Sequence, residues 1–199
     1  MTPAAAPTLS LLIPTFGRNS LARTIASALP QLADGDEIVV IGDTRAGPLP
    51  ATEAICAAAG SRVRYLPHDG GRMSHGHDQL NHGMRRATGD YLAFNDDDDI
   101  WTPGALRAMR ASAATHPGVP LLFRFRSYHG GRVFWDAPGL VAEGHVGGHC
   151  LVTPNDPARL GRWTKRYQGD FDFVRDTLAR YPPDAARWLD TLIAIARPT

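Results

Sequence analysis

The chain has 199 residues, a length typical of one large domain, and its apolar fraction of 43% excludes a disordered protein. Its 21 basic and 20 acidic side chains leave a net charge of +1, which argues against a protein that coats a polyanion. Two cysteines allow at most one bridge, which excludes a disulfide scaffold. Apolar runs all fall short of the ~18 residues of a membrane span, and segment 1–8 lacks the basic start of a signal peptide. We therefore expect a cytoplasmic protein with no transmembrane segment.

Apolar runs and amphipathic segments alternate four times before residue 116. Continuous apolar runs are typical of buried strands, and apolar residues spaced three and four apart are typical of helices. The expected strands are 9–13, 37–41, 63–66 and 91–95. The expected helices are about 20–32, 52–59, 74–87 and 102–115. This alternation predicts an α/β fold with a doubly wound parallel layer.

The pattern changes in the rest of the chain. The expected elements there are a hairpin of strands 121–126 and 132–135, a strand at 150–153, and helices at about 169–180 and 184–196. We expect a single domain over residues 1–199. Its nucleotide-binding half would cover about 9–116, and its mixed second half about 117–199.

Four consecutive carboxylates, Asp96 to Asp99, follow the apolar run at 91–95. Ligands of open α/β sheets bind at the carboxyl ends of the strands. Adjacent carboxylates repel one another, and either solvent or a divalent cation has to relieve that repulsion. Oxygen ligands suit Mg²⁺ or Mn²⁺, which also bind substrate phosphates. The tetrad is therefore either a metal and phosphate site or a solvated acidic turn before the next helix.

Three segments, taken in order, resemble the inverting family 2 glycosyltransferases of the GT-A fold. Segment 89–103, with the tetrad, resembles the Asp-x-Asp segment of that family. Residues 11–18 resemble its first strand and nucleotide loop, and residues 81–89 resemble its Asn-x-Gly helix. The resemblance implies a single-domain GT-A fold with a Rossmann-like half and a mixed central sheet flanked by helices. It also implies a metal-dependent, inverting transfer of a sugar from a nucleotide-diphosphate sugar to an acceptor hydroxyl.

The resemblance assigns roles to residues on the donor side. Asp96 and Asp98, the two ends of the Asp-x-Asp motif, would hold Mn²⁺ or Mg²⁺ and face the donor, with Asp97 beside them. Asp43 stands where a carboxylate reads the nucleobase, although the usual companions of that carboxylate are missing. The other donor-side candidates are Pro14, Thr15, Phe16, Arg18, Arg72, Asn81, Gly148 and His149.

An inverting transfer needs a general base for the acceptor hydroxyl. The resemblance places this base at the start of a late helix, where Asp170 aligns with it and Asp172 is the second candidate. Asp170 would lie in the first helical turn, where the helix dipole favours an anion. The other interpretation of Asp170 is an ordinary acid at a helix N-terminus.

The identity of the acceptor stays open among glycans, lipid-linked sugars, proteins, small molecules and modified nucleic acids, whereas a UDP-sugar is the first choice of donor. Arg124, Arg126 and Arg132 form a basic patch on the expected hairpin, which is either a site for an anionic acceptor or a solvated face. A homo-oligomer is compatible with the sequence.

Two alternative functions remain at this point. A nucleotidyltransferase would usually show a more glycine-rich and basic loop than residues 14–18. A non-catalytic module that binds a divalent cation or a carbohydrate would need no acid at Asp170.

Overall fold

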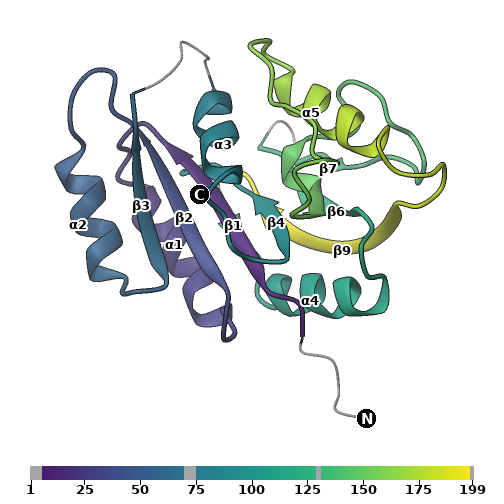
Figure 1. Ribbon diagram of the computed structural model, residues 1–199, viewed down its shortest axis with the longest axis horizontal. Coiled ribbons are helices and arrows are strands. Elements are labelled where there is room, and N and C mark those ends of the chain that lie inside the picture. Colours follow the sequence, from purple (N-terminus) through teal and green to yellow (C-terminus); the bar gives the residue numbers. More distant parts are fainter. Residues whose placement is uncertain (1–5, 70–74, 129–130, 198–199) are drawn as a thin grey trace.

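The structure is a computed structural model that describes residues 6–69, 75–128 and 131–197 (Figure 1). A mixed β-sheet flanked by helices runs through this part of the chain, as the sequence predicts. Its strands in spatial order are β3 (Val63–His68), β2 (Glu37–Asp43), β1 (Leu9–Thr15), β4 (Tyr91–Phe94), β8 (Leu151–Pro154), β6 (Leu121–Arg126), β9 (Arg187–Ile195) and β5 (Ile100–Trp101). A further short strand, β7 (Val133–Phe134), pairs with β6 beside this path.

The half of the sheet built from the N-terminal strands is parallel. β1 pairs in parallel with β2 and β4, and β2 pairs in parallel with β3. All seven residues of β1 and all seven of β2 are buried, as expected for strands covered on both faces. This double burial is why these strands have continuous apolar sequences. The four strands expected in this half are confirmed, and their ends differ by one or two residues from the prediction.

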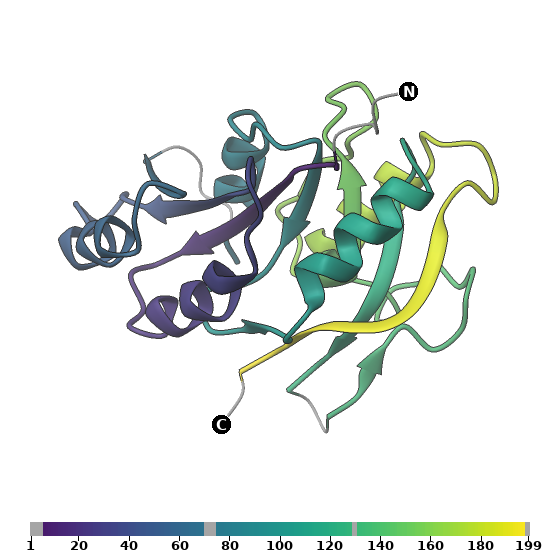
Figure 2. The ribbon, with the colours of Figure 1, turned by 90° about the horizontal axis from the view of Figure 1, so that it is seen from below.

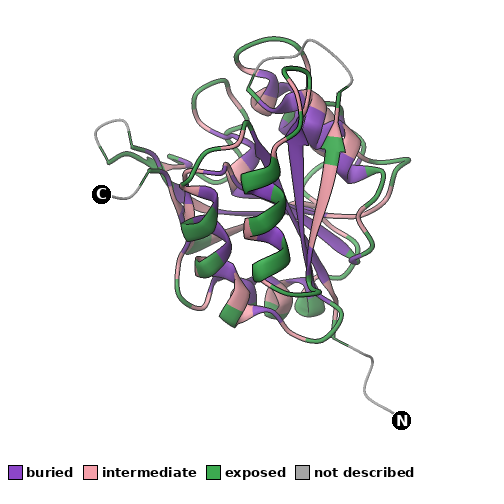
Figure 3. Ribbon diagram, turned by 90° about the vertical axis from the view of Figure 1, so that its left-hand side faces the viewer, coloured by how far each residue is buried: buried purple, intermediate pink, exposed green. Residues whose placement is uncertain are grey.

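The α-helices of the described chain are α1 (Leu21–Ala28), α2 (Pro50–Ala58), α3 (His77–Met84), α4 (Ala105–Thr115) and α5 (Gly169–Leu178). α1 and α4 lie on one side of the sheet, whereas α3 and α5 lie on the other (Figure 2). Figure 3 shows buried strands between helices whose outer faces are exposed. α3 packs very closely on the sheet, because a Cβ atom at Gly83 would lie 2.7 Å from Cδ1 of Ile41. None of the described helices is both long and apolar enough to cross a membrane.

The second half of the sheet is mixed. β8 runs antiparallel to both β4 and β6, and β6 forms the expected antiparallel hairpin with β7. A short helical turn, η2 (Gly148–Cys150), leads directly into β8. The strand expected at 150–153 and the helix expected at 169–180 are thus confirmed as β8 and α5.

The helix expected at 184–196 is wrong, because this segment forms the strand β9. It pairs in parallel with β6 and in antiparallel with β5. Its apolar residues fit a helical spacing, but Thr191, Ile193 and Ile195 also alternate and are β-branched, which favours a strand. The edge of β6 supplies hydrogen-bond partners along the segment, and this tertiary pairing decides between the two patterns.

Asp36 connects β1, α4 and the loop that precedes β2. Its carboxylate accepts hydrogen bonds from the backbone N–H groups of Leu9 and Ala33, each at 2.8 Å. The same carboxylate forms an ion pair with Arg110 of α4, and Arg110 also donates to the carbonyl of Gln31 at 3.1 Å. The Asp36 side chain is fully buried, so Arg110 supplies the charge that makes its burial tolerable.

We predict that Arg110→Met lowers the free energy of unfolding by about 3 kcal/mol, because it leaves the buried Asp36 carboxylate without a counter-ion. Urea unfolding measures this change. Arg107→Met is the matched control, since Arg107 is exposed on the same helix and its substitution should change stability by less than about 0.5 kcal/mol. Equal effects of the two substitutions would contradict the role of Arg110.

Candidate active site

A cavity of about 350 Å³ opens at the carboxyl end of β4. Its walls come from the segment after β4, from η2, from the loop before α5, from the first turn of α5 and from the end of β9. Strand ends of this kind are where open α/β sheets bind ligands. The side chains in its wall include Asp96, Asp99, His149, Trp163 and Asp170.

Three potential metal ligands meet in this cavity. One ligand atom each from Asp96, Asp99 and His149 lies within 4.8 Å of the other two. Nε2 of His149 is 3.0 Å from Oδ2 of Asp99 and 3.6 Å from Oδ2 of Asp96. The imidazole stacks on the Phe125 ring, with centroids 4.5 Å apart and planes at 14°, which fixes its orientation. Two carboxylate oxygens and an imidazole nitrogen can together serve as ligands of a divalent metal ion.

The charges in this group perturb one another. The pKa of Asp96 is raised to about 6, first by its burial inside the cavity and then by the like charges of Asp99 and Asp98. Its side chain nevertheless keeps 47% of its surface open, so the carboxylate is accessible from the cavity. Burial alone lowers the pKa of His149, but the adjacent Asp99 and Asp96 outweigh it and raise the pKa to about 9. A cationic imidazole therefore offsets part of the acidic charge at neutral pH, and a divalent cation would do the same.

The other two carboxylates of the tetrad are held by arginines. Oδ2 of Asp97 accepts a hydrogen bond from the Thr15 hydroxyl at 2.6 Å, and Oδ1 accepts one from Arg18 at 2.9 Å. Asp98 lies between Arg18 at 2.9 Å and Arg197 at 3.0 Å. Asp97 and Asp98 are therefore both engaged in ion pairs with arginine side chains.

A tight turn explains this division. The N–H of Asp99 donates to the carbonyl of Asp96 at 3.3 Å, so the first and fourth residues of the tetrad return to the same side. The Asp-x-Asp resemblance predicts that Asp96 and Asp98 hold the metal, whereas in the structure Asp99 and His149 lie next to Asp96. The Asp-x-Asp spacing alone does not reveal this arrangement.

Arg197 is a residue of the site that the sequence analysis missed. Its backbone N–H donates to Oδ1 of Asp99 at 2.8 Å, while its guanidinium reaches Asp98. Arg197 directly follows segment 184–196, for which the sequence predicts a helix. A helix in that position gives no reason to expect Arg197 beside the tetrad.

His77 is a second residue of the site that is not among the candidates predicted from the sequence. It lines the cavity, and its Nδ1 lies 2.8 Å from the carbonyl of Thr164, which can only accept a hydrogen bond. Burial lowers the pKa of His77.

The candidates Pro14, Thr15, Phe16, Arg18 and Asp43 lie at the carboxyl ends of β1 and β2 or just beyond β1, outside the wall of the cavity. Phe16 is 44% exposed, and Pro14 packs against the start of α3, where a Cβ atom at Gly76 would lie 2.6 Å from the proline. Asp43 ends β2 and forms an ion pair with Arg45, whose hydrogen bonds lower the pKa of Asp43. Arg72 lies outside the described residues.

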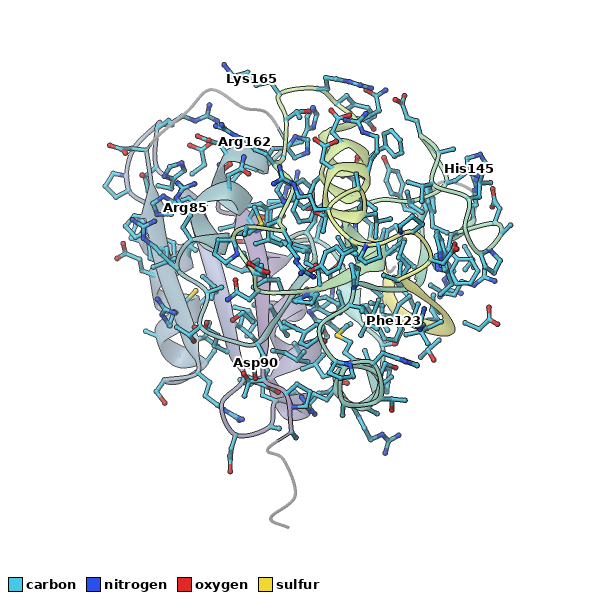
Figure 4. The ribbon with its side chains drawn as sticks, turned by 45° about the vertical axis from the view of Figure 1, so that its right-hand side comes forward. Arg85, Asp90, Phe123, His145, Arg162 and Lys165 are labelled. Atoms are coloured by element: carbon cyan, nitrogen blue, oxygen red, sulfur yellow. The ribbon has the colours of Figure 1, made fainter. Side chains whose placement is uncertain are left out.

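Asn81 holds the cavity wall in place. Its Nδ2 donates to the carbonyl of Trp163 at 2.9 Å, and its Oδ1 accepts from the N–H of Trp163 at 3.2 Å. Both ends of the amide are used within the protein. Arg162 and Lys165 in the same loop are exposed (Figure 4). Trp163 between them is only 4% exposed. In the structure Asn81 therefore positions Trp163, and its donor role stays a prediction.

Trp163 packs between aromatic rings and a glycine. It stacks on Phe173, with centroids 4.8 Å apart and planes at 13°, and meets Phe94 edge-on at 5.5 Å. A Cβ atom at Gly148 would lie 2.2 Å from Cη2 of Trp163. Glycine at position 148 therefore makes room for the indole, whereas the sequence analysis expected it to face the donor.

We predict that Gly148→Ala destabilises the protein by about 1–3 kcal/mol, because the added methyl group overpacks Trp163. Urea unfolding measures the effect in a double-mutant cycle with Trp163→Leu, in which the smaller side chain should remove most of it. An undiminished effect in the Trp163→Leu background would show that the contact with the indole is not the cause.

Asp170 and Asp172 lie in different surroundings, although both are in the first turn of α5. Asp170 lines the cavity, and a Cβ atom at Gly147 would lie 2.6 Å from its Oδ2. Asp172 is 3% exposed, and its Oδ2 accepts a hydrogen bond from the Thr164 hydroxyl at 2.6 Å. Its Oδ1 lies 3.3 Å from Arg175. Of the two, Asp170 is the carboxylate that faces the cavity.

The basic patch expected on the hairpin is largely neutralised. Arg124 pairs with Asp190 at 2.8 Å, and its guanidinium lies 3.8 Å from the Trp135 ring centroid. Arg132 pairs with Asp136 at 2.5 Å. Two of the three arginines thus have partners within the protein.

Comparison with known proteins bears on the family and the fold of this chain. The sequence model of glycosyl transferase family 2 matches residues 10–180. An uncharacterized glycosyltransferase of Rickettsia felis is 31% identical over 101 residues, which cover 50% of this chain and 16% of that protein. The chain thus spans about a sixth of the length of this relative.

Solved structures share the fold at low sequence identity. S. aureus TarS superposes with a TM-score of 0.73 and 13% identity, over 96% of this chain and 37% of TarS. TarS 1–349 in complex with UDP-GlcNAc gives a TM-score of 0.71 and 14% identity, over 95% of this chain and 58% of that one. These matches confirm the expected fold class. Because the family match covers most of its length, the chain belongs to glycosyl transferase family 2.

Proposed function

We propose that this protein transfers a sugar, with inversion at its C1 atom, from a nucleotide-diphosphate sugar to an acceptor hydroxyl in a metal-dependent reaction. One observation carries the proposal: the acidic group of Asp96, Asp99 and His149 and the separate carboxylate of Asp170 line the same cavity. Such a cavity offers one place for the diphosphate and another for the base. Membership of glycosyl transferase family 2 supports the reaction class.

The metal would bind to Asp96, Asp99 and Nε2 of His149, and the imidazole would lose its proton when it binds the metal. The three ligand atoms are mutually close, and Asp98 is engaged by two arginines, so Asp99 fits the metal better than Asp98 does. When bound, Mn²⁺ or Mg²⁺ supplies positive charge to the leaving diphosphate. Arg197 holds Asp99 in position through its backbone N–H.

The nucleotide would lie along the carboxyl ends of β1 and β2, next to the cavity. Asp43, at the end of β2, would read the base, and the exposed Phe16 ring would pack against the nucleoside. The solved complex of TarS with UDP-GlcNAc supports a UDP-sugar as donor. Calorimetry with UDP-, GDP- and dTDP-sugars in Mn²⁺ tests this choice, and wild-type protein that binds none of them would contradict the proposed function.

Asp170 would act as the general base. It takes the proton of the acceptor hydroxyl as the acceptor oxygen forms a bond to C1 of the sugar, and the bond from C1 to the diphosphate breaks on the opposite face. The position of Asp170 in the cavity and the hydrogen bonds that engage Asp172 support this assignment.

We also propose that residues 1–199 act as one domain, with the donor bound mainly by 9–116 and the acceptor mainly by 117–199.

We predict that Mn²⁺ at a hundred times its Kd raises the Tm of the wild-type protein by about 5–10 °C, because it binds only the folded acidic group. Differential scanning calorimetry measures this shift, without any need for turnover. Asp99→Asn should abolish most of it, whereas Asp98→Asn should retain it. The reverse order for the two variants would return the metal to the Asp-x-Asp pair of the sequence analysis.

We predict that Asp170→Asn reduces turnover by about 10²–10⁴-fold, because the amide keeps the shape of the side chain but cannot accept the proton. Donor affinity should hardly change, since the residue faces the acceptor. Asp172→Asn is the matched control on the same helical turn. If it slows transfer while Asp170→Asn stays active, the base is Asp172.

A further inference from the structure

Two buried asparagines near the cavity differ in their hydrogen bonding. Asn81 is 5% exposed, and both ends of its amide bond to the backbone of Trp163. Asn95 is 2% exposed, yet neither its Nδ2 nor its Oδ1 has a hydrogen-bond partner among the described residues. A buried amide without partners destabilises the folded state, because its groups lose their hydrogen bonds to water and gain none. Packing alone therefore gives no reason for an asparagine at position 95.

The position of Asn95 indicates that its amide could bind a ligand in the cavity. It directly follows β4, where its backbone N–H donates to the carbonyl of Leu12 at 3.2 Å, and it directly precedes Asp96. It lines the cavity together with His149 and Trp163. Apart from Nε2 of His149, which lies 3.0 Å from Asp99, nine buried side-chain polar atoms of the described chain lack a hydrogen bond, and three of them belong to Asn95 and Trp163. Unmade hydrogen bonds thus gather at this cavity.

We propose that Asn95 is a specificity-determining residue that hydrogen-bonds the transferred sugar of the donor. This inference rests on the proposed function and names a contact of the same site. A sugar hydroxyl both donates and accepts hydrogen bonds, which matches an amide that offers a donor and an acceptor. The indole N–H of Trp163, a donor only, adds a second contact of the same kind.

The expected path of the reaction places the sugar next to Asn95. C1 of the sugar has to lie between the diphosphate, held near Asp96, and the base Asp170, and both residues line the cavity with Asn95. A neutral amide suits the uncharged sugar better than the diphosphate, which calls for cations. The amide atoms of Asn95 are covered by protein, but the terminal torsion of an asparagine is soft, so the amide can turn toward a bound hydroxyl.

Asn95→Leu tests the proposal because leucine has nearly the same shape and no hydrogen-bonding groups. If the amide has no partner in the free protein, the variant should raise the Tm by about 2–4 °C, measured by differential scanning calorimetry without ligands. The matched control is Asn81→Leu, which removes two hydrogen bonds to Trp163 and should lower the Tm by at least that amount. A fall of the Tm for Asn95→Leu comparable with that of the control would show a structural amide and overturn the proposal.

Calorimetric binding in Mn²⁺ supplies the second measurement. The probes are UDP-GlcNAc, or whichever nucleotide sugar the wild-type protein binds in the donor screen, and the same nucleotide diphosphate without its sugar. Asn95→Leu should weaken binding of the nucleotide sugar about tenfold and change that of the nucleotide diphosphate less than twofold. Equal weakening of both, or of neither, overturns the proposal.

The two arms separate this inference from the proposed function. If the wild-type protein binds no nucleotide sugar, the proposed function fails on its own evidence. The ligand-free comparison of Asn95→Leu with Asn81→Leu then still decides whether Asn95 holds an unused amide in the folded protein, with a fall of the Tm counting against the inference and a rise counting for it.

Discussion

Repulsion among four consecutive carboxylates is the constraint on which the organisation of this site depends. The turn after β4 relieves it by directing the side chains to two sides, with Asp96 and Asp99 in the cavity and Asp97 and Asp98 against arginines. One of these arginines, Arg18, follows β1. Strands from distant parts of the chain are therefore needed to stabilise one acidic turn.

Much of the fold follows from sequence patterns because local and tertiary preferences agree there. The parallel strands are buried on both faces, so their continuous apolar runs are unambiguous. The pattern of β9 is ambiguous, because its residues satisfy both a helical and a strand period. Only the position of β6 beside it decides, and a position in the sheet cannot be derived from the segment itself. Secondary structure can thus be predicted from the sequence where the pattern of a segment fits only one element. The prediction fails where hydrogen bonds to a neighbouring strand decide between two elements.

The same distinction holds for the candidate site. The tetrad, His149 and Asp170 could be selected from the sequence, since the tetrad follows an expected strand, His149 precedes one and Asp170 lies at the start of an expected helix. The division of the tetrad could not, because it depends on a turn whose geometry the Asp-x-Asp spacing leaves open. Gly148 could be selected as a donor-side residue, but the contact with the Trp163 ring that requires a glycine there could not. Arg197 was beyond reach because its place depends on the strand that was predicted as a helix.

The contacts that define the cavity join residues that are far apart in the sequence. The hydrogen bonds of Thr15 with Asp97 and of Asn81 with Trp163 each span 82 positions, and that of Arg197 with Asp99 spans 98. Closing such long loops is slow, and its entropy has to be offset by contacts formed later. During synthesis on the ribosome, the parallel layer of β1 to β4 can therefore form before the walls of the cavity exist. The cavity closes only when β9 has left the ribosome and brought Arg197 to the acidic turn.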